Sequence, residues 1–126
     1  IFIAVFGGFI WYASTMPNLP PTDLQGHVEE NPSSHIIDKP MPESIQKHML
    51  EHADGKGAPG VIIQYNCQKY TCRSDLVEKL KTVVDKYPQN VYLAPGSYDG
   101  KIILTRLGKR EILADFDEGR IIDFID

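Results

Sequence analysis

The sequence predicts an α+β domain that follows a single N-terminal transmembrane helix. Three features indicate this arrangement: an apolar run at the start, a proline-rich stem, and short β-branched runs that alternate with amphipathic helical patterns. A chain of 126 residues has room for one domain and an appendage. We expect a small mixed sheet of about four strands with three helices, in an order compatible with a thioredoxin-like arrangement.

The apolar run at residues 1–15 is the predicted transmembrane anchor. No charged side chain occurs before Asp23, and Trp11 and Tyr12 suit the aromatic belt at a membrane interface. The run is shorter than the roughly 20 residues that a bilayer core requires, and the chain does not start with Met. We therefore expect an anchor that is incomplete at its N-terminus. A signal-peptide core and a buried soluble helix are the alternatives.

The stem, residues 16–26, separates the predicted anchor from a domain that we place at residues 27–126. Its prolines favour extended geometry, which spaces the domain from the bilayer. The stem has no Lys or Arg, so the positive-inside rule favours a single-pass protein of the cell membrane with its domain on the extracytoplasmic side. A net charge of −4 without a basic run makes nucleic acid a poor partner.

Within the domain, hydrophobic periodicity and turn residues predict the helices and strands. Ser74 and Asp117 are expected to cap the second and third helices at their N-termini. The predicted helices cover about 42–52, 75–87 and 118–125, and the predicted strands cover 61–66, 91–94, 101–107 and 111–114.

All four histidines lie between positions 27 and 52, which suggests a metal site. His48 and His52 have the i, i+4 spacing that lets two imidazoles on one helix face bind one ion. His27 and His35 come from irregular segments that could fold over the helix. Met49 would add a soft thioether ligand, which favours copper narrowly over zinc. The zinc-protease pattern is absent because Glu does not follow the first histidine.

Each of these residues also has an ordinary structural interpretation. A single histidine commonly bonds a backbone carbonyl or caps a turn, and Met49 and Ile45 suit a hydrophobic core. Helical spacing is expected to turn Glu51 away from His48 and His52, into solvent or a capping role.

Several motifs together resemble a family of membrane-anchored extracytoplasmic domains of unknown function with a His-x-Leu-Glu-His core. The matching segments are His27-Val28, Asn31 to His35, His48-Met49-Leu50-Glu51-His52, Gly60 to Tyr65, and Leu113 to Ile125. The resemblance covers the chain from about Gly26 to its C-terminus.

This resemblance implies no established reaction. It implies that the family motifs bring together His27, His35, His48, Glu51 and His52. This chain departs from the family pattern after His52, at Ser33-Ser34, and in its pair of cysteines.

Cys67 and Cys72 lie between a predicted strand and the N-terminus of a predicted helix. A close cysteine pair in an oxidising compartment typically forms a structural disulfide, which is the interpretation we favour. The position also suits a thiol–disulfide oxidoreductase. Four residues separate the two cysteines, however, whereas redox pairs of the thioredoxin-like fold normally have two.

We therefore predict a membrane-anchored metal-binding protein, with copper as the expected cofactor. It could serve as an accessory subunit of a larger membrane complex, since Gly7-Gly8 would permit close packing against partner helices. One alternative is a purely structural subunit of a complex such as a copper-dependent monooxygenase or oxidase. The other is a thioredoxin-like thiol–disulfide oxidoreductase. We identify no set of catalytic residues.

Overall fold

The computed structural model of this protein describes residues 18–26, 28–53 and 58–126. The predicted anchor at residues 1–15 and His27 lie outside the described residues. Among the residues described, no helix is long and apolar enough to span a bilayer. The elements, in chain order, are α2 (Glu43–Glu51), β1 (Val61–Tyr65), α3 (Leu76–Asp85), β2 (Val91–Pro95), β3 (Ile102–Arg106), β4 (Lys109–Leu113) and α4 (Glu118–Ile125).

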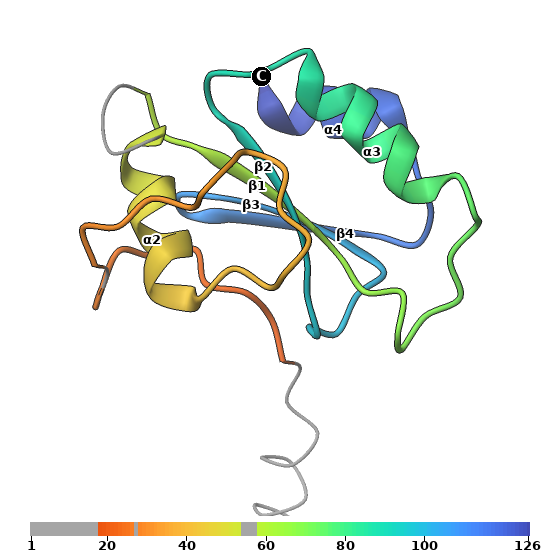
Figure 1. Ribbon diagram of the computed structural model, residues 1–126, viewed down its shortest axis with the longest axis horizontal. Coiled ribbons are helices and arrows are strands. Elements are labelled where there is room, and N and C mark those ends of the chain that lie inside the picture. The colour runs from red at the N-terminus through yellow and green to blue at the C-terminus, as the bar shows by residue number, and fades with distance from the viewer. Residues whose placement is uncertain (1–17, 27, 54–57) are drawn as a thin grey trace, which may run out of the picture.

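The described part of the chain is an α+β domain with three helices and one mixed four-stranded sheet, as predicted (Figure 1). The strand order is β2-β1-β3-β4. β1 and β2 are parallel, with Val61 opposite Val91, and α3 forms the crossover between them. β3 is antiparallel to both β1 and β4. Beyond β2, a parallel bridge between Ile36 and Leu93 brings the N-terminal segment to the sheet edge.

Helices cover both faces of the sheet. In Figure 1, α3 and α4 lie next to each other on one side and α2 lies on the other. Side chains alternate between these two layers: Val61 and Ile63 join the α3 and α4 core, whereas Ile62 joins the α2 core. Because both faces are covered, the first four residues of β1, β2 and β3 are all buried.

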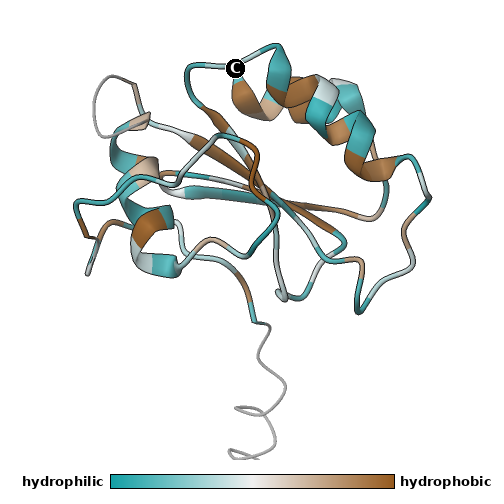
Figure 2. Cartoon of the chain, viewed as in Figure 1, coloured by the Kyte–Doolittle hydropathy of each residue, from teal (hydrophilic) through white to brown (hydrophobic). Residues whose placement is uncertain are grey.

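The larger core forms where the apolar stripes of α3 and α4 meet the sheet. Leu80, Val83 and Val84 of α3 and Ile121 and Phe124 of α4 are almost fully buried there. In Figure 2 hydrophobic and hydrophilic segments alternate along these helices, as expected for amphipathic helices on a sheet. Each such side chain contributes roughly 1.5–3 kcal/mol through its burial.

The N-cap residue is the predicted one in α4 but not in α3. Asp117 caps α4, since its side chain accepts a hydrogen bond from the Arg120 backbone N–H at 3.2 Å. The prediction of Ser74 as the cap of α3 is wrong. Asp75 occupies the N-cap position and makes no side-chain capping bond. Its carboxylate instead lies 3.3 Å from Lys79 Nζ, one turn along the helix.

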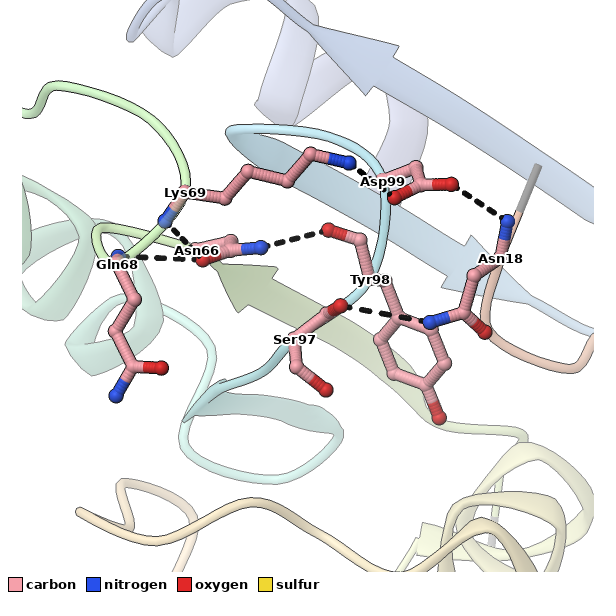
Figure 3. Close-up of polar contacts among 7 residues, drawn as sticks. All are labelled: Asn18, Asn66, Gln68, Lys69, Ser97, Tyr98 and Asp99. Carbon is pink, nitrogen blue, oxygen red and sulfur yellow. Dashed lines mark hydrogen bonds and ion pairs between the residues drawn. The ribbon is translucent and has the colours of Figure 1, made fainter. Parts of the chain in front are cut away.

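The segment predicted as a stem is joined to the rest of the domain by backbone and side-chain contacts from residue 18 onward. The Gly108 backbone N–H donates to Thr22 O at 2.8 Å, and Arg110 donates to Pro20 O at 2.7 Å. At residue 18, the Asn18 backbone N–H donates to the carboxylate of Asp99 at 2.8 Å (Figure 3). The end of the stem is thus held against the β2–β3 loop and the β3–β4 hairpin.

Candidate metal centre

The candidate centre is built on α2, which is held on the sheet by its apolar side. Met49 and Leu50 are fully buried against a cluster that includes Ile62 and Tyr92. Residues three and four positions apart share a helix face. His48 and Glu51 are therefore neighbours on α2, three positions apart, and His48 is only 3% exposed.

A third side chain, a carboxylate from the N-terminal segment, meets these two. Glu29, His48 and Glu51 each offer one ligand atom, and these three atoms lie within 4.8 Å of one another. His48 Nδ1 is 3.5 Å from Glu29 Oε2. We call these three residues the metal cluster. Its ligands come from two segments that only the folded chain brings together.

Contacts between α2 and the segment before Glu29 position that residue. The Lys47 ammonium donates to Gln25 O at 2.6 Å and lies 3.4 Å from the Asp23 carboxylate. The Val28 backbone N–H donates to Ser44 O at 3.4 Å. The Glu29 side chain itself is 78% exposed, so one side of the cluster opens to solvent.

His52 lies next to the cluster but outside it. α2 ends at Glu51, and His52 is the C-cap residue, with an extended backbone (φ −143°, ψ 117°). Its backbone N–H still donates to His48 O at 3.0 Å, as in a last helical turn, but its imidazole is not part of the metal cluster. The His52 imidazole is 46% exposed, and its Nε2 lies 3.3 Å from Glu51 Oε1. The His52 imidazole is therefore in polar contact with the Glu51 carboxylate.

The structure places His35 at the edge of the sheet. Its Nδ1 lies 2.9 Å from Val91 O, and its ring stacks on Tyr92 with centroids 4.1 Å apart and planes at 13°. Since the adjacent Ile36 bridges to Leu93, this imidazole helps to fix the N-terminal segment on β2. Of the predicted histidine ligands, only His48 is in the metal cluster among the residues described.

Met49 has no exposed surface and lies in the α2 core with Met41 and Leu50. Packing explains its burial, and this apolar environment does not support a role as a soft, copper(I)-type ligand. The metal cluster instead offers one imidazole nitrogen and two carboxylate oxygens. Such donors suit divalent ions such as Zn²⁺ or Cu²⁺, and three protein ligands leave coordination positions open.

The sequence analysis does not identify Glu29 as a ligand, and it includes Glu51 only through the family resemblance. Glu29 lies in an irregular segment, and only its position two residues after His27 could have drawn attention to it. Glu51 was expected to face solvent. The i, i+3 relation to His48 places it on the same side, which is the sequence signal that could have identified it.

The cysteine pair is separate from the metal cluster. Cys72 packs against the α3 and α4 core, on the sheet face opposite to α2. Cys67 and Cys72 are at disulfide distance, with Cα atoms 5.5 Å apart, in the loop between β1 and α3. Asn66 orders this loop: its side-chain oxygen accepts the backbone N–H groups of Gln68 and Lys69, and its amide donates to Tyr98 O (Figure 3). Cys67 is exposed and Cys72 is half-buried.

Comparisons of this chain with protein-family models, with curated proteins and with solved structures found no match. The resemblance to a family of membrane-anchored domains therefore stays a prediction from the sequence motifs.

Proposed function

We propose that this protein binds a divalent transition-metal ion on α2, in a domain that a membrane anchor holds on the extracytoplasmic side. The observation that carries the proposal is the convergence of Glu29, His48 and Glu51, with ligand atoms within 4.8 Å of one another. His52 would act as an outer partner that orients Glu51.

The mixed nitrogen and oxygen donors are compatible with Zn²⁺ and with Cu²⁺, the oxidised form of the copper predicted from the sequence. Two carboxylates supply negative charge that a divalent cation would neutralise. The one exposed ligand, Glu29, gives the ion a path in and out. These features suit a protein that holds or transfers metal, including an accessory subunit of a larger membrane complex.

Metal titration of matched variants tests the site. Changing His48→Ala or Glu29→Gln should weaken the affinity for Cu²⁺ and Zn²⁺ at least about tenfold, because each change removes one of three ligands. Glu30→Gln is the control, since it removes the same charge one residue from Glu29 in the same segment. Equal affinities for the Glu29 and Glu30 variants would reject the site, because the effect would then come from net charge.

Elemental analysis would identify the metal. The protein should be purified from its own membrane without affinity metals, so that any copper or zinc reflects natural loading. Chains that copurify would identify partner subunits. Two results together would contradict the proposal. They are a preparation free of transition metal, and a wild-type protein that binds Cu²⁺ and Zn²⁺ no more tightly than the His48→Ala variant does.

The cysteine pair supports a second candidate, a thiol–disulfide oxidoreductase. Cys67 and Cys72 follow a parallel strand and precede α3, and the strand order β2-β1-β3-β4 with a final helix suits the thioredoxin-like arrangement predicted from the sequence. The exposure of Cys67 would allow attack by a thiolate. A measured reduction potential below about −300 mV would reject this candidate, because such a disulfide stays oxidised.

A further inference from the structure

A cavity of about 530 Å³, lined by none of the residues of the metal cluster, lies at the carboxyl end of β1. It is bounded by Tyr65 at the end of that strand, by Val77 and Lys81 of α3, by Ile45 of α2, and by the segment 32–42. Its volume is within the range of small-molecule sites, roughly 300–1,000 Å³. Clefts at the carboxyl ends of parallel strands are also where α/β sheets commonly bind ligands.

The walls of this cavity are mainly aliphatic. Ile36, Ile37, Ile45 and Val77 line it, and all four side chains are only partly buried. Ile36 packs against the α3 and α4 core, whereas Ile37 and Ile45 pack against the α2 core. The cavity is therefore where the two cores meet, and an apolar ligand there would remove exposed aliphatic surface from water.

The polar groups of the cavity carry a net positive charge. Lys39 and Lys81 supply two ammonium groups and Asp38 supplies one carboxylate. Burial raises the pKa of the Tyr65 phenol, while Lys81 lowers it and Asp38 raises it to smaller extents. The phenol thus stays protonated at neutral pH and can donate a hydrogen bond. Lys81 pairs with Glu78 at 3.4 Å, but Glu78 is mostly exposed, so this ion pair is weak.

We propose that this cavity binds a small organic carboxylate with an aliphatic body. The aliphatic walls would take the body, and Lys81 and the Tyr65 hydroxyl would bind the carboxylate. A neutral ligand would gain no ion pair with Lys39 or Lys81. An aliphatic amine would be repelled by both lysines and attracted only by Asp38. The excess of positive charge therefore selects the anion.

The test uses three eight-carbon probes with different head groups: octanoate, 1-octanol and octylammonium. They are titrated into the 126-residue protein labelled at isoleucine and valine methyl groups, and binding is followed by NMR. We expect octanoate to bind most tightly, with shifts centred on the methyl groups of Ile36, Ile45 and Val77. Equal or tighter binding of octylammonium, or shifts centred elsewhere, would overturn the proposal.

Variants of α3 separate the carboxylate from the aliphatic contribution. Lys81→Gln should weaken octanoate about tenfold and leave 1-octanol within about twofold, because one charge-assisted contact is lost. Lys79→Gln is the control: it removes the same charge from the same helix, but Lys79 does not line the cavity. Equal losses of octanoate binding in the two variants would contradict the role of Lys81. Val77→Ser should weaken both probes by similar factors.

Discussion

The side-chain amide of Gln64, on β1, donates a 3.0 Å hydrogen bond to Gln46 Oε1, on α2, and both side chains are almost fully buried. Gln46 in turn donates to Met41 O at 2.8 Å and to the Tyr98 hydroxyl at 3.1 Å. This polar chain links α2, β1 and the β2–β3 loop within the otherwise apolar α2 layer. It fixes the helix that carries His48 and Glu51 at one position on the sheet.

Gln46→Ala should therefore destabilise the domain by about 2–3 kcal/mol, since it leaves buried polar groups of Gln64 and Met41 without their bonds. Urea unfolding monitored by circular dichroism measures this change. Gln68→Ala, in the exposed cysteine loop, is the control and should stay within about 0.5 kcal/mol of wild type. Similar stabilities for the two variants would show that the buried chain of hydrogen bonds contributes little.

A close backbone approach at Gly60 gives a second prediction. A Cβ at this position would lie 2.5 Å from the backbone oxygen of Met49, which also accepts the Gly60 N–H at 2.8 Å. Gly60→Ala should cost about 1–3 kcal/mol through the resulting strain at the end of α2. Gly119→Ala is the matched control. Its Cβ would meet nothing closer than 3.6 Å, and removing a helical glycine should stabilise α4 by about 0.5 kcal/mol. Thermal unfolding should thus shift in opposite directions for the two variants.

The third prediction concerns the pH dependence of the contact between Asn18 and Asp99. The hydrogen bond from Lys69, together with that from the Asn18 backbone N–H, lowers the pKa of Asp99 below its ordinary value (Figure 3). A carboxylate with a lowered pKa contributes stability above its unfolded pKa of about 3.9, and this stability is lost as the pH falls through the folded pKa. The attachment of Asn18 should therefore persist at neutral pH and weaken below about pH 4.

Amide hydrogen exchange at Asn18, measured against pH, would detect this detachment. Asp99→Asn should increase the exchange rate at neutral pH and remove its acid dependence, because Asn carries no titrating charge. An Asn18 amide that stays equally protected in the wild type and in this variant would contradict the role of Asp99.

The fourth prediction separates His35 from the metal cluster. His35→Ala should cost about 1–2 kcal/mol, because it removes the stack on Tyr92 and the bond to Val91 O. Affinity for Cu²⁺ or Zn²⁺ should stay within about twofold of wild type, in contrast to the loss expected for His48→Ala. Metal titration and unfolding of the same sample provide both readings. A tenfold loss of metal affinity would place His35 among the ligands, as the sequence suggested.

The local elements of this domain were predictable because their signals lie within short stretches of chain. Leu80, Val83 and Val84 recur at helical spacing and form the buried side of α3. The β-branched run at Val61 to Ile63 forms a strand that is covered on both faces. The cysteines, five positions apart, lie at disulfide distance as expected. In each case the residues that form the pattern lie within a few positions of one another in the sequence.

The candidate site depended on the tertiary structure. Histidine spacing predicts that His48 and His52 bind one ion together, but in the structure His48 shares the metal cluster with Glu29 and Glu51 and not with His52. Glu29, 19 positions before His48 in the sequence, meets it instead because contacts from Lys47 hold the N-terminal segment along α2. Side chains from distant segments meet only when the chain is folded, and no local periodicity encodes such a meeting. The sequence by itself thus determined the helices, the strands and the cysteine pair. Tertiary packing decided which carboxylate and imidazole groups come together in the metal cluster.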